Sequence, residues 1–145
     1  MIDIPTTAKE RSLSSAPKDF RAWNAKKSDL HENKPRIAFF NEKDVWFASL
    51  GSNIGFEQDG KGHDFLRPIV VLKKFNNETL WGVPLTSKNK AGKYYFSFKH
   101  GTTSSSTANL SQMRLIDSKR LGYKVGTISE PDFQELKKRI IDLIE

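Results

Sequence analysis

Apolar positions are sparse and helically spaced near the start of the chain. In the segment 17–34 the large apolar side chains are Phe20, Trp23 and Leu30. This spacing predicts a short helix that opens at Pro17, with Ser14 or Ser15 as its N-cap. The helix should end before Pro35, because the residue ahead of a proline resists the helical conformation. Three apolar side chains are too few to stabilise this helix on its own. We therefore expect Phe20 and Trp23 to pack on the rest of the chain or on a second copy.

The pattern changes at residue 36, where short aliphatic and aromatic runs begin and predict strands. The predicted strands are 45–50, 68–72, 80–85, 94–98 and 110–116. The run 68–72 is apolar throughout, which suits a strand buried on both faces. Trp46 and Trp81 lie within such runs and are expected in the core. The hydroxyl-rich stretch 102–107 is expected to be a linker.

The last segment carries the clearest helical pattern. Ser129 offers an N-cap and Pro131 suits the first turn of the helix. The apolar stripe that follows consists of Phe133, Leu136, Ile140, Leu143 and Ile144. Several strands followed by one closing helix predict a mainly β, α+β fold, a small β-barrel packed by the C-terminal helix. We expect an N-terminal tail and short helix over residues 1–35 and the barrel domain over residues 36–145.

Composition narrows the chemistry. The 145 residues include no cysteine, which excludes disulfides, zinc–thiolate sites, iron–sulfur clusters and a thiol nucleophile. The three histidines lie far apart in the sequence, so we expect neither a metal site nor another cofactor. No apolar run approaches the roughly 18 residues that span a bilayer, and the N-terminus lacks a signal-peptide stretch. The sequence thus indicates a cytoplasmic protein with no membrane partner.

Charge favours an anionic partner. The chain has 24 basic and 17 acidic residues and a net charge of +7. Between Thr79 and Ile116 there are five bases and not one Asp or Glu. Such a stretch raises the local potential wherever it reaches the surface, and nucleic acid is the commonest polyanion for a basic chain. A lysine-rich solvated loop with acids nearby in space is the structural alternative.

A glycine-rich loop separates the first two predicted strands. The segment 51–62 holds four glycines in twelve residues. Such a loop is expected to be mobile and to expose its backbone, and it is longer than a hairpin requires. Long loops on compact domains often carry function, so this loop is a candidate part of a site.

Five segments carry a resemblance to a known family. In order they are Asp44–Leu50, Asn53–Gln58, Arg67–Leu72, Pro84–Ser87 and Ser111–Leu121. Together they resemble the MazF/PemK-type toxins, which are ribosome-independent mRNA interferases of type II toxin–antitoxin pairs. The resemblance runs from about Asp44 to the C-terminus and leaves the N-terminal segment outside it.

The resemblance implies an SH3-like barrel, a homodimer, and metal-independent cleavage of single-stranded RNA. In that reaction the 2′-hydroxyl of the substrate attacks the adjacent phosphate and leaves a cyclic or 3′-phosphate and a free 5′-hydroxyl. The resemblance also implies a cognate antitoxin whose acidic, partly disordered segment occupies the RNA groove. The chemistry requires a base for the 2′-hydroxyl, a cation for the phosphate and a proton source for the leaving oxygen.

Three residues are candidates for the catalytic roles. By the resemblance, Arg67 stabilises the transition state and can donate the proton, and a guanidinium can bind a phosphate through two hydrogen bonds. Thr86 contacts the scissile phosphate or positions the 2′-hydroxyl, and Glu57 acts as the base or orients Arg67. The structural alternatives are that Arg67 only tethers the loop by pairing with Glu57, Asp59 or Asp64, and that Glu57 makes a loop-closing hydrogen bond.

A wider set of residues is expected to bind the RNA. Its members are Gln58, Lys61, His63, Ser87, Lys88, Lys90, Lys93, Gln112 and Arg114. Gln58 can read a base edge, and the lysines can follow the phosphates. Gln112 and Arg114 face the RNA groove or brace the loop, and for Arg114 an ion pair with Asp117 is an equal alternative.

The chain also departs from the family pattern. Some members carry a histidine where this chain has Phe56, and an acid–arginine pairing where it has Ser111 and Asn109. The identity of the base is therefore open, and His63, in an insertion over residues 60–66, can substitute. Two alternatives remain beside an endoribonuclease: a gyrase-binding toxin that resembles CcdB and cuts nothing, and a catalytically inactive member that only binds RNA or the antitoxin.

Overall fold

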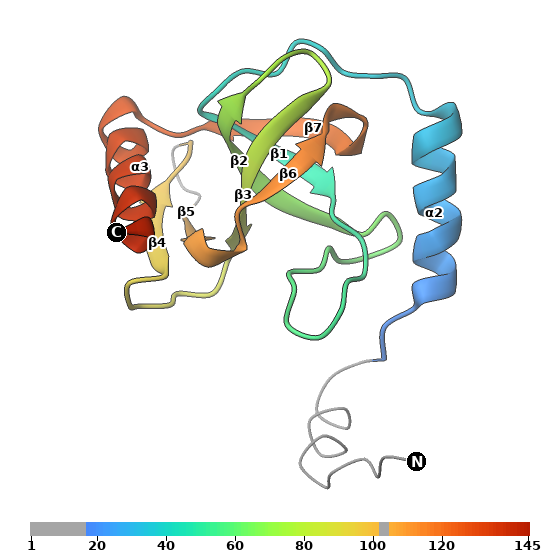
Figure 1. Ribbon diagram of the computed structural model, residues 1–145, viewed down its shortest axis with the longest axis horizontal. Coiled ribbons are helices and arrows are strands. Elements are labelled where there is room, and N and C mark those ends of the chain that lie inside the picture. Colours follow the sequence, from blue (N-terminus) through green and yellow to red (C-terminus); the bar gives the residue numbers. More distant parts are fainter. Residues whose placement is uncertain (1–16, 102–104) are drawn as a thin grey trace, which may run out of the picture.

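The computed structural model describes residues 17–101 and 105–145 of the chain. Its helices and strands, labelled as in Figure 1, are α2 Phe20–Asn33, β1 Asp44–Ser49, β2 Leu66–Lys74, β3 Thr79–Thr86, β4 Tyr95–Lys99, β5 Ser105–Asn109, η1 Leu110–Gln112, β6 Arg114–Asp117, η2 Ser118–Arg120, β7 Leu121–Thr127 and α3 Glu130–Ile144. Helices α2 and α3 flank the sheet on opposite sides (Figure 1). None of the described helices has both the length and the apolar character needed to cross a membrane.

The sheet is antiparallel throughout and runs in the order β4-β5-β3-β2-β1-β7. Strand β3 is its hub, because its first half pairs with β6 and its end pairs with β5. Gly82 permits the close pairing with β6, since a Cβ there would overlap the side chain of Ile116. Among the described residues the two ends of the path meet only at a single bridge between His100 and Ile128. The α+β class is confirmed, but the sheet that the described residues form does not close into the predicted barrel.

Strand β2 separates two apolar clusters. Val70 and Leu72 belong to one cluster and Ile69 and Val71 to the other, because successive side chains of a strand point to opposite faces. The prediction that the run 68–72 is buried on both faces is therefore confirmed. These two clusters form the core against which the site is built.

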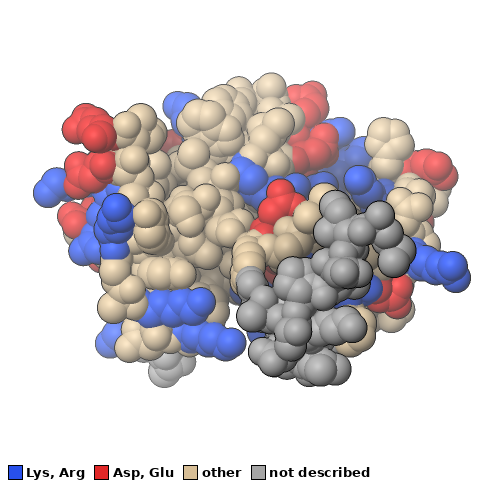
Figure 2. Space-filling view, turned by 60° about the horizontal axis from the view of Figure 1, so that its bottom comes forward, with Lys and Arg blue, Asp and Glu red and all other residues tan. Residues whose placement is uncertain are grey.

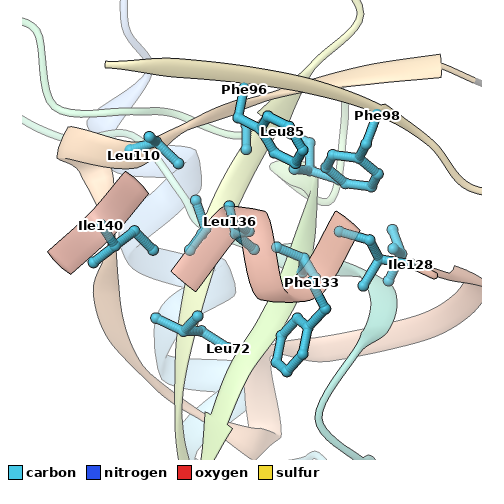
Figure 3. Packing of buried hydrophobic residues seen from close by; sticks show 13 residues of the cluster. Leu72, Leu85, Phe96, Phe98, Leu110, Ile128, Phe133, Leu136 and Ile140 are labelled. Atoms are coloured by element: carbon cyan, nitrogen blue, oxygen red, sulfur yellow. The ribbon is translucent and has the colours of Figure 1, made fainter. Parts of the chain in front are cut away.

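Helix α3 covers the first of these clusters. Ser129 caps it by accepting from the backbone N–H of Asp132 at 3.3 Å, as the sequence predicts. The buried side chains of the helix, Phe133, Leu136 and Ile140, belong to the same cluster as Phe96 and Phe98 of β4 (Figure 3). At the end of the stripe, Ile144 remains 78% exposed.

Helix α2 begins and ends close to its predicted limits. Its N-cap is Asp19, whose carboxylate accepts from the N–H of Ala22 at 2.9 Å. The helix ends at Asn33, before Pro35 as expected. The predicted caps Ser14 and Ser15 lie outside the described residues.

The prediction of a linker over residues 102–107 was wrong at its end, where a polar sequence forms a strand. The linker predicted to end at residue 107 gives way at residue 105 to strand β5, while 102–104 lie outside the described residues. In β5 the buried hydroxyls of Ser106 and Thr107 are satisfied by hydrogen bonds to His100 and Ser97, both at 2.7 Å. A side-chain partner lets a polar residue be buried without loss of hydrogen bonding.

Three further differences concern the second half of the chain. The predicted strand 110–116 divides into the 3₁₀ turn η1 and strand β6. Strand β7 was not predicted, because its sequence is polar and contains two glycines. Trp46 is buried as expected, but Trp81 is 40% exposed, because it alternates with the buried positions of β3 and stacks edge-on with Phe75 on the outer face.

Candidate functional site

The β1–β2 loop, residues 50–65, is closed by its own hydrogen bonds. The side chain of Asn53 donates to the carbonyl oxygens of Leu50 and Gln58 at 3.1 and 2.9 Å. The carboxylate of Glu57 accepts from the N–H of Ile54 at 2.9 Å, which is the loop-closing bond that the sequence offered as the alternative for this residue. The loop therefore holds a defined shape in which Glu57 is exposed and bonded to its own turn.

Arg67 stands where this loop rejoins the sheet, and its guanidinium is covered. Its Nε donates to the carbonyl oxygen of Asp59, and one terminal nitrogen donates to the carbonyl oxygen of Leu85 at 3.1 Å. With its carboxamide oxygen turned toward Arg67, Gln58 accepts from two guanidinium nitrogens at 3.2 and 3.1 Å. The residue is only 8% exposed. Burial lowers the pKa of Arg67 from its usual value, while the nearby Asp59 charge opposes this shift.

These contacts decide between the two roles predicted for Arg67 only in part. The Arg67 side chain does tether the loop, but it binds the backbone carbonyl of Asp59 and not the carboxylate. The Asp59 carboxylate pairs with Lys18 instead. The carboxylate of Asp64 pairs with Lys26 at 3.0 Å. In this conformation a phosphate cannot reach two nitrogens of the guanidinium unless the loop shifts.

Arg67 and Thr86 nevertheless lie on the same side of the sheet. They line a cavity of about 450 Å³, here called the Arg67 cavity, together with Lys61 and Ser87. The Thr86 hydroxyl oxygen accepts from the N–H of Lys88 at 3.2 Å, which leaves its O–H free to donate into the cavity. The structure thus brings together four of the predicted site residues.

A second group of predicted residues lines a separate cavity of about 330 Å³, here called the Gln112 cavity. Its predicted members are Glu57, Gln58, Gln112 and Arg114. The Gln112 side chain accepts from the N–H of Gln58 at 3.1 Å and donates to the carbonyl oxygen of Phe56 at 2.9 Å, so it braces the loop. Burial lowers the pKa of Arg114, and the Glu57 charge opposes this shift. Glu57 therefore faces Arg114 and not the Arg67 cavity.

The alternative for Arg114 as an ion-pair partner of Asp117 is wrong. Asp117 pairs with Arg36 at 2.6 Å, because the segment that follows α2 crosses the end of β6. Arg114 thus keeps its guanidinium directed toward the Gln112 cavity, where its charge faces Glu57.

The remaining predicted residues lie apart from both cavities. The His63 side chain is fully exposed and 3.4 Å from Asp64. Lys88 and Lys90 are exposed in the β3–β4 connection, and Lys93 lines a hollow beside α3 instead. On the face shown in Figure 2, Lys and Arg side chains form separate groups with acidic side chains between them. The described residues on this face therefore do not form a single continuous basic stripe.

Sequence reasoning missed the residues that hold the loop from outside. Arg120 donates to the carbonyl oxygens of Ser49 and Leu50 at 3.0 and 3.5 Å, where the loop leaves β1. Lys18 binds the loop from the N-terminal segment. Arg120 lies in the late segment of the resemblance, but no pattern in the sequence indicates its backbone partners. Among the described residues no three His, Asp or Glu side chains are grouped to hold a metal ion.

Comparison with known proteins adds to this geometry. Residues 41–144 match the family described as PemK-like, MazF-like toxin of type II toxin–antitoxin system. The search of curated proteins found no match. The fold is similar to that of MazF from Deinococcus radiodurans, with a TM-score of 0.59 and 16% identity over 78% of this chain and 98% of that one.

Two mycobacterial structures are similar as well. The toxin MazF-mt6 of Mycobacterium tuberculosis gives a TM-score of 0.54 with 15% identity, over 70% of this chain and 95% of that one. An endoribonuclease from a mycobacterial species, solved in complex with its cognate antitoxin, gives 0.52 with 12% identity, over 71% and 92% of the two chains. At these identities the likeness concerns the fold, and the family rests on the match over residues 41–144. The chain belongs to the PemK/MazF-like toxin family of type II toxin–antitoxin systems.

Proposed function

We propose that this toxin is an endoribonuclease that cuts single-stranded RNA by attack of the 2′-hydroxyl on the adjacent phosphate. The observation that carries the proposal is that Arg67 and Thr86 line one cavity beside a long, hydrogen-bonded loop. A cation and a hydroxyl donor at one point are what a pentavalent phosphate requires for its developing charge. The endoribonuclease activity of a mycobacterial structural neighbour is consistent with this assignment.

Arg67 is proposed to stabilise the transition state and Thr86 to orient the phosphate. The guanidinium becomes available when Asp59 and Gln58 move away, because these two residues occupy its nitrogens in the present conformation. Thr86 needs no such movement, since its hydroxyl already borders the Arg67 cavity. Opening of the loop is thus part of the proposed mechanism.

Glu57 is proposed as the base that the opened loop delivers. It lies on the same loop, two positions before Asp59, so a shift that uncovers Arg67 also moves Glu57 away from its turn. The described residues that line the Arg67 cavity include no carboxylate or imidazole, which makes a residue from the moving loop the nearest source of a base. The exposed His63 is the alternative source.

The RNA strand is proposed to follow the two cavities. Gln58 lines the Gln112 cavity, and its carboxamide, turned toward Arg67, connects it to a residue that lines the other cavity. Arg114 offers a partly buried cation beside it. The exposed Lys61 lines the Arg67 cavity, and the exposed Lys88 lies two residues beyond Thr86 in the chain, so both suit contacts to neighbouring phosphates.

A cognate antitoxin and a second copy of this chain are the proposed protein partners. An acidic antitoxin segment is electrostatically suited to the same basic residues as the RNA. MazF from Deinococcus radiodurans has been solved together with MazE, with a TM-score of 0.56 to this chain. We also propose that the division at residue 36 separates an accessory segment from the toxin domain, and that the protein acts in the cytoplasm.

The test uses the purified full chain and single-stranded RNA in the presence of EDTA. Cleavage should leave 5′-hydroxyl ends. Thr86→Val keeps the β-branched shape of a strand residue and removes only the hydroxyl, so it should fold normally and cut about 10²-fold more slowly. Arg67→Lys should lose at least as much, because an ammonium cannot make the two-point contact. Cleavage by Thr86→Val at the rate of the unmodified chain would remove the Arg67 cavity from the mechanism.

One observation favours a second candidate, an RNA- or antitoxin-binding protein without turnover. The guanidinium of Arg67 is almost wholly buried and bonded to protein acceptors. If this arrangement is permanent, the cavity has no cation to offer. Gel retardation of RNA without any cleaved product, by a chain that is folded and monodisperse, would establish this second function in place of the first.

A further inference from the structure

Helix α2 (Figure 1) lies outside the segment that matches the family, and Lys18, two positions before its first residue, binds the β1–β2 loop. The ammonium of Lys18 donates to the carbonyl oxygens of Asn53 and Gly55, the latter at 2.9 Å. The same ammonium pairs with the carboxylate of Asp59 at 3.2 Å. One cation from the accessory segment therefore ties three points of the loop.

Trp23 fixes the two ends of the same loop. Its indole covers Gly51, where a Cβ would collide with the ring, so the close approach requires glycine. The ring of Phe65 packs beside it with 5.3 Å between centroids. Gly51 and Phe65 are themselves joined by a backbone hydrogen bond of 3.3 Å. Trp23, which is buried as the sequence predicts, thus packs against both ends of the loop, where it leaves β1 and where it joins β2.

The indole also contacts a cation of the late segment. The Arg120 guanidinium lies 5.6 Å from the centre of the Trp23 ring while it binds the carbonyl oxygens at the end of β1. Phe20, which was expected to pack in the same way, remains 51% exposed, because it borders an open hollow between α2 and the loop. A third contact, between Lys26 and Asp64, holds the far arm of the loop.

Asp59 connects these contacts to the candidate active site. Its carboxylate binds Lys18, and its backbone carbonyl binds Arg67. A movement of Asp59 that frees the guanidinium therefore has to break or stretch the Lys18 contact. The loop and the accessory helix are mechanically joined at this residue.

We propose that the segment from Lys18 through α2 is an intramolecular clamp that holds the β1–β2 loop over Arg67. Lys18 and Trp23 are its positioning residues, and they act on Arg67 through the loop. Release of the clamp leaves the loop braced by Gln112 but without its cationic tie, so the conformation that exposes Arg67 becomes more populated. The effect on RNA cleavage rests on the proposed function, whereas the cover of Arg67 does not.

The experiment measures access to Arg67 directly. The full chain is treated with phenylglyoxal, which modifies guanidinium groups, and peptide mass spectrometry follows the rate at Arg67, with Arg139 of α3 as an internal reference. Lys18→Ala is compared with Lys27→Ala, a change of equal charge at an exposed residue of α2 that borders the same loop but has no ion pair to any described residue. Lys18→Arg keeps the cation and serves as the conservative variant.

The clamp predicts that Lys18→Ala raises the rate at Arg67 about fivefold, the effect of losing an exposed ion pair near the top of its usual range. Lys27→Ala and Lys18→Arg should match the unmodified chain, and Arg139 should not change. Equal rates at Arg67 in all four proteins would overturn the proposal. An equal acceleration at Arg139 would overturn it too, because it would mark general unfolding.

RNA cleavage by the same proteins separates this proposal from the proposed function. If both hold, Lys18→Ala cuts RNA faster by a factor similar to its gain in Arg67 modification. A gain in modification without a gain in cleavage would support the clamp and contradict the catalytic role of Arg67. Trp23→Ala, compared by the same two measurements, should act in the same direction as Lys18→Ala.

Discussion

The two helices of this toxin are attached to the sheet by different physical means. Helix α3 inserts Phe133, Leu136 and Ile140 into a cluster that continues through five strands, and it completes the core. Helix α2 buries only Trp23 and Leu30, and lysines make most of its other contacts. Helix α3 is thus part of the hydrophobic core, whereas α2 packs on the surface of the domain.

The difference is one of energy as well as of chemistry. A fully buried aliphatic or aromatic side chain contributes about 1.5–3 kcal/mol, so the three core residues of α3 are inseparable from folding. Exposed ion pairs such as Lys26–Asp64 contribute about 0–1 kcal/mol and weaken with salt. From this comparison we expect the toxin domain to stay folded when α2 is displaced, as the proposed clamp requires.

The largest effect is expected from a truncation in α3. Leu136→Ala removes a fully buried side chain from the core, so we expect the free energy of unfolding to fall by about 2–5 kcal/mol. Denaturant unfolding followed by circular dichroism measures this change. Ile144→Ala, in the same stripe but exposed, should change it by less than about 0.5 kcal/mol. Equal losses in both variants would contradict the assignment of α3 to the core.

A smaller and local effect is expected where α2 meets the loop. Gly51→Ala places a methyl group against the Trp23 ring at a backbone φ of +87°, so it should displace α2 at a cost of about 1–3 kcal/mol. Hydrogen exchange should accelerate in α2 and not in α3. Gly55→Ala is the matched control, because Gly55 also has a positive φ but has open space where the added Cβ would lie. If both variants release α2 equally, backbone strain and not the indole contact is responsible.

The smallest effect is a pH dependence of the α2 contact. Hydrogen bonds from Lys26 and then His63 lower the pKa of Asp64 below its usual 3.8, so the ionised carboxylate favours the folded state. This stabilisation is fully present above the unfolded pKa and is lost as the pH falls through the folded one. Below about pH 4, exchange in α2 should therefore accelerate by an amount worth about 0.5 kcal/mol or less. Asp64→Asn should remove this acid-dependent change, and its persistence in that variant would assign it to another group.

The sequence predicts the parts of the fold that depend on apolar pattern and capping. Helix α3, strands β1 to β4 and the end of α2 before Pro35 all follow from such local rules. Strand β5 could not be predicted, because its buried hydroxyls are satisfied by partners on a neighbouring strand. Trp81 was wrongly expected in the core, since its face is set by the pairing of β3 with β6 and not by its own hydrophobicity.

The candidate site divides in the same way. The resemblance predicts which residues gather around the loop, and the structure places Arg67 with Thr86 and Gln112 with Arg114. The resemblance does not predict that Arg67 is covered. The partners of Arg67 include backbone carbonyl oxygens, and residue types do not reveal where these oxygens lie. The contacts of Lys18 are of this kind too.

The connection between α2 and β1 gives the clamp one more property. Residues 34–43 join the two elements, and this connection is itself held, since Lys34 binds the carbonyl oxygen of Leu121 and Arg36 pairs with Asp117. A tethered element of this kind returns to its seat at an effective concentration of about a millimolar, whatever the abundance of the protein. An inhibitor on a separate chain dissociates when the protein is diluted. The clamp belongs to the same chain, so its occupancy does not depend on the protein concentration.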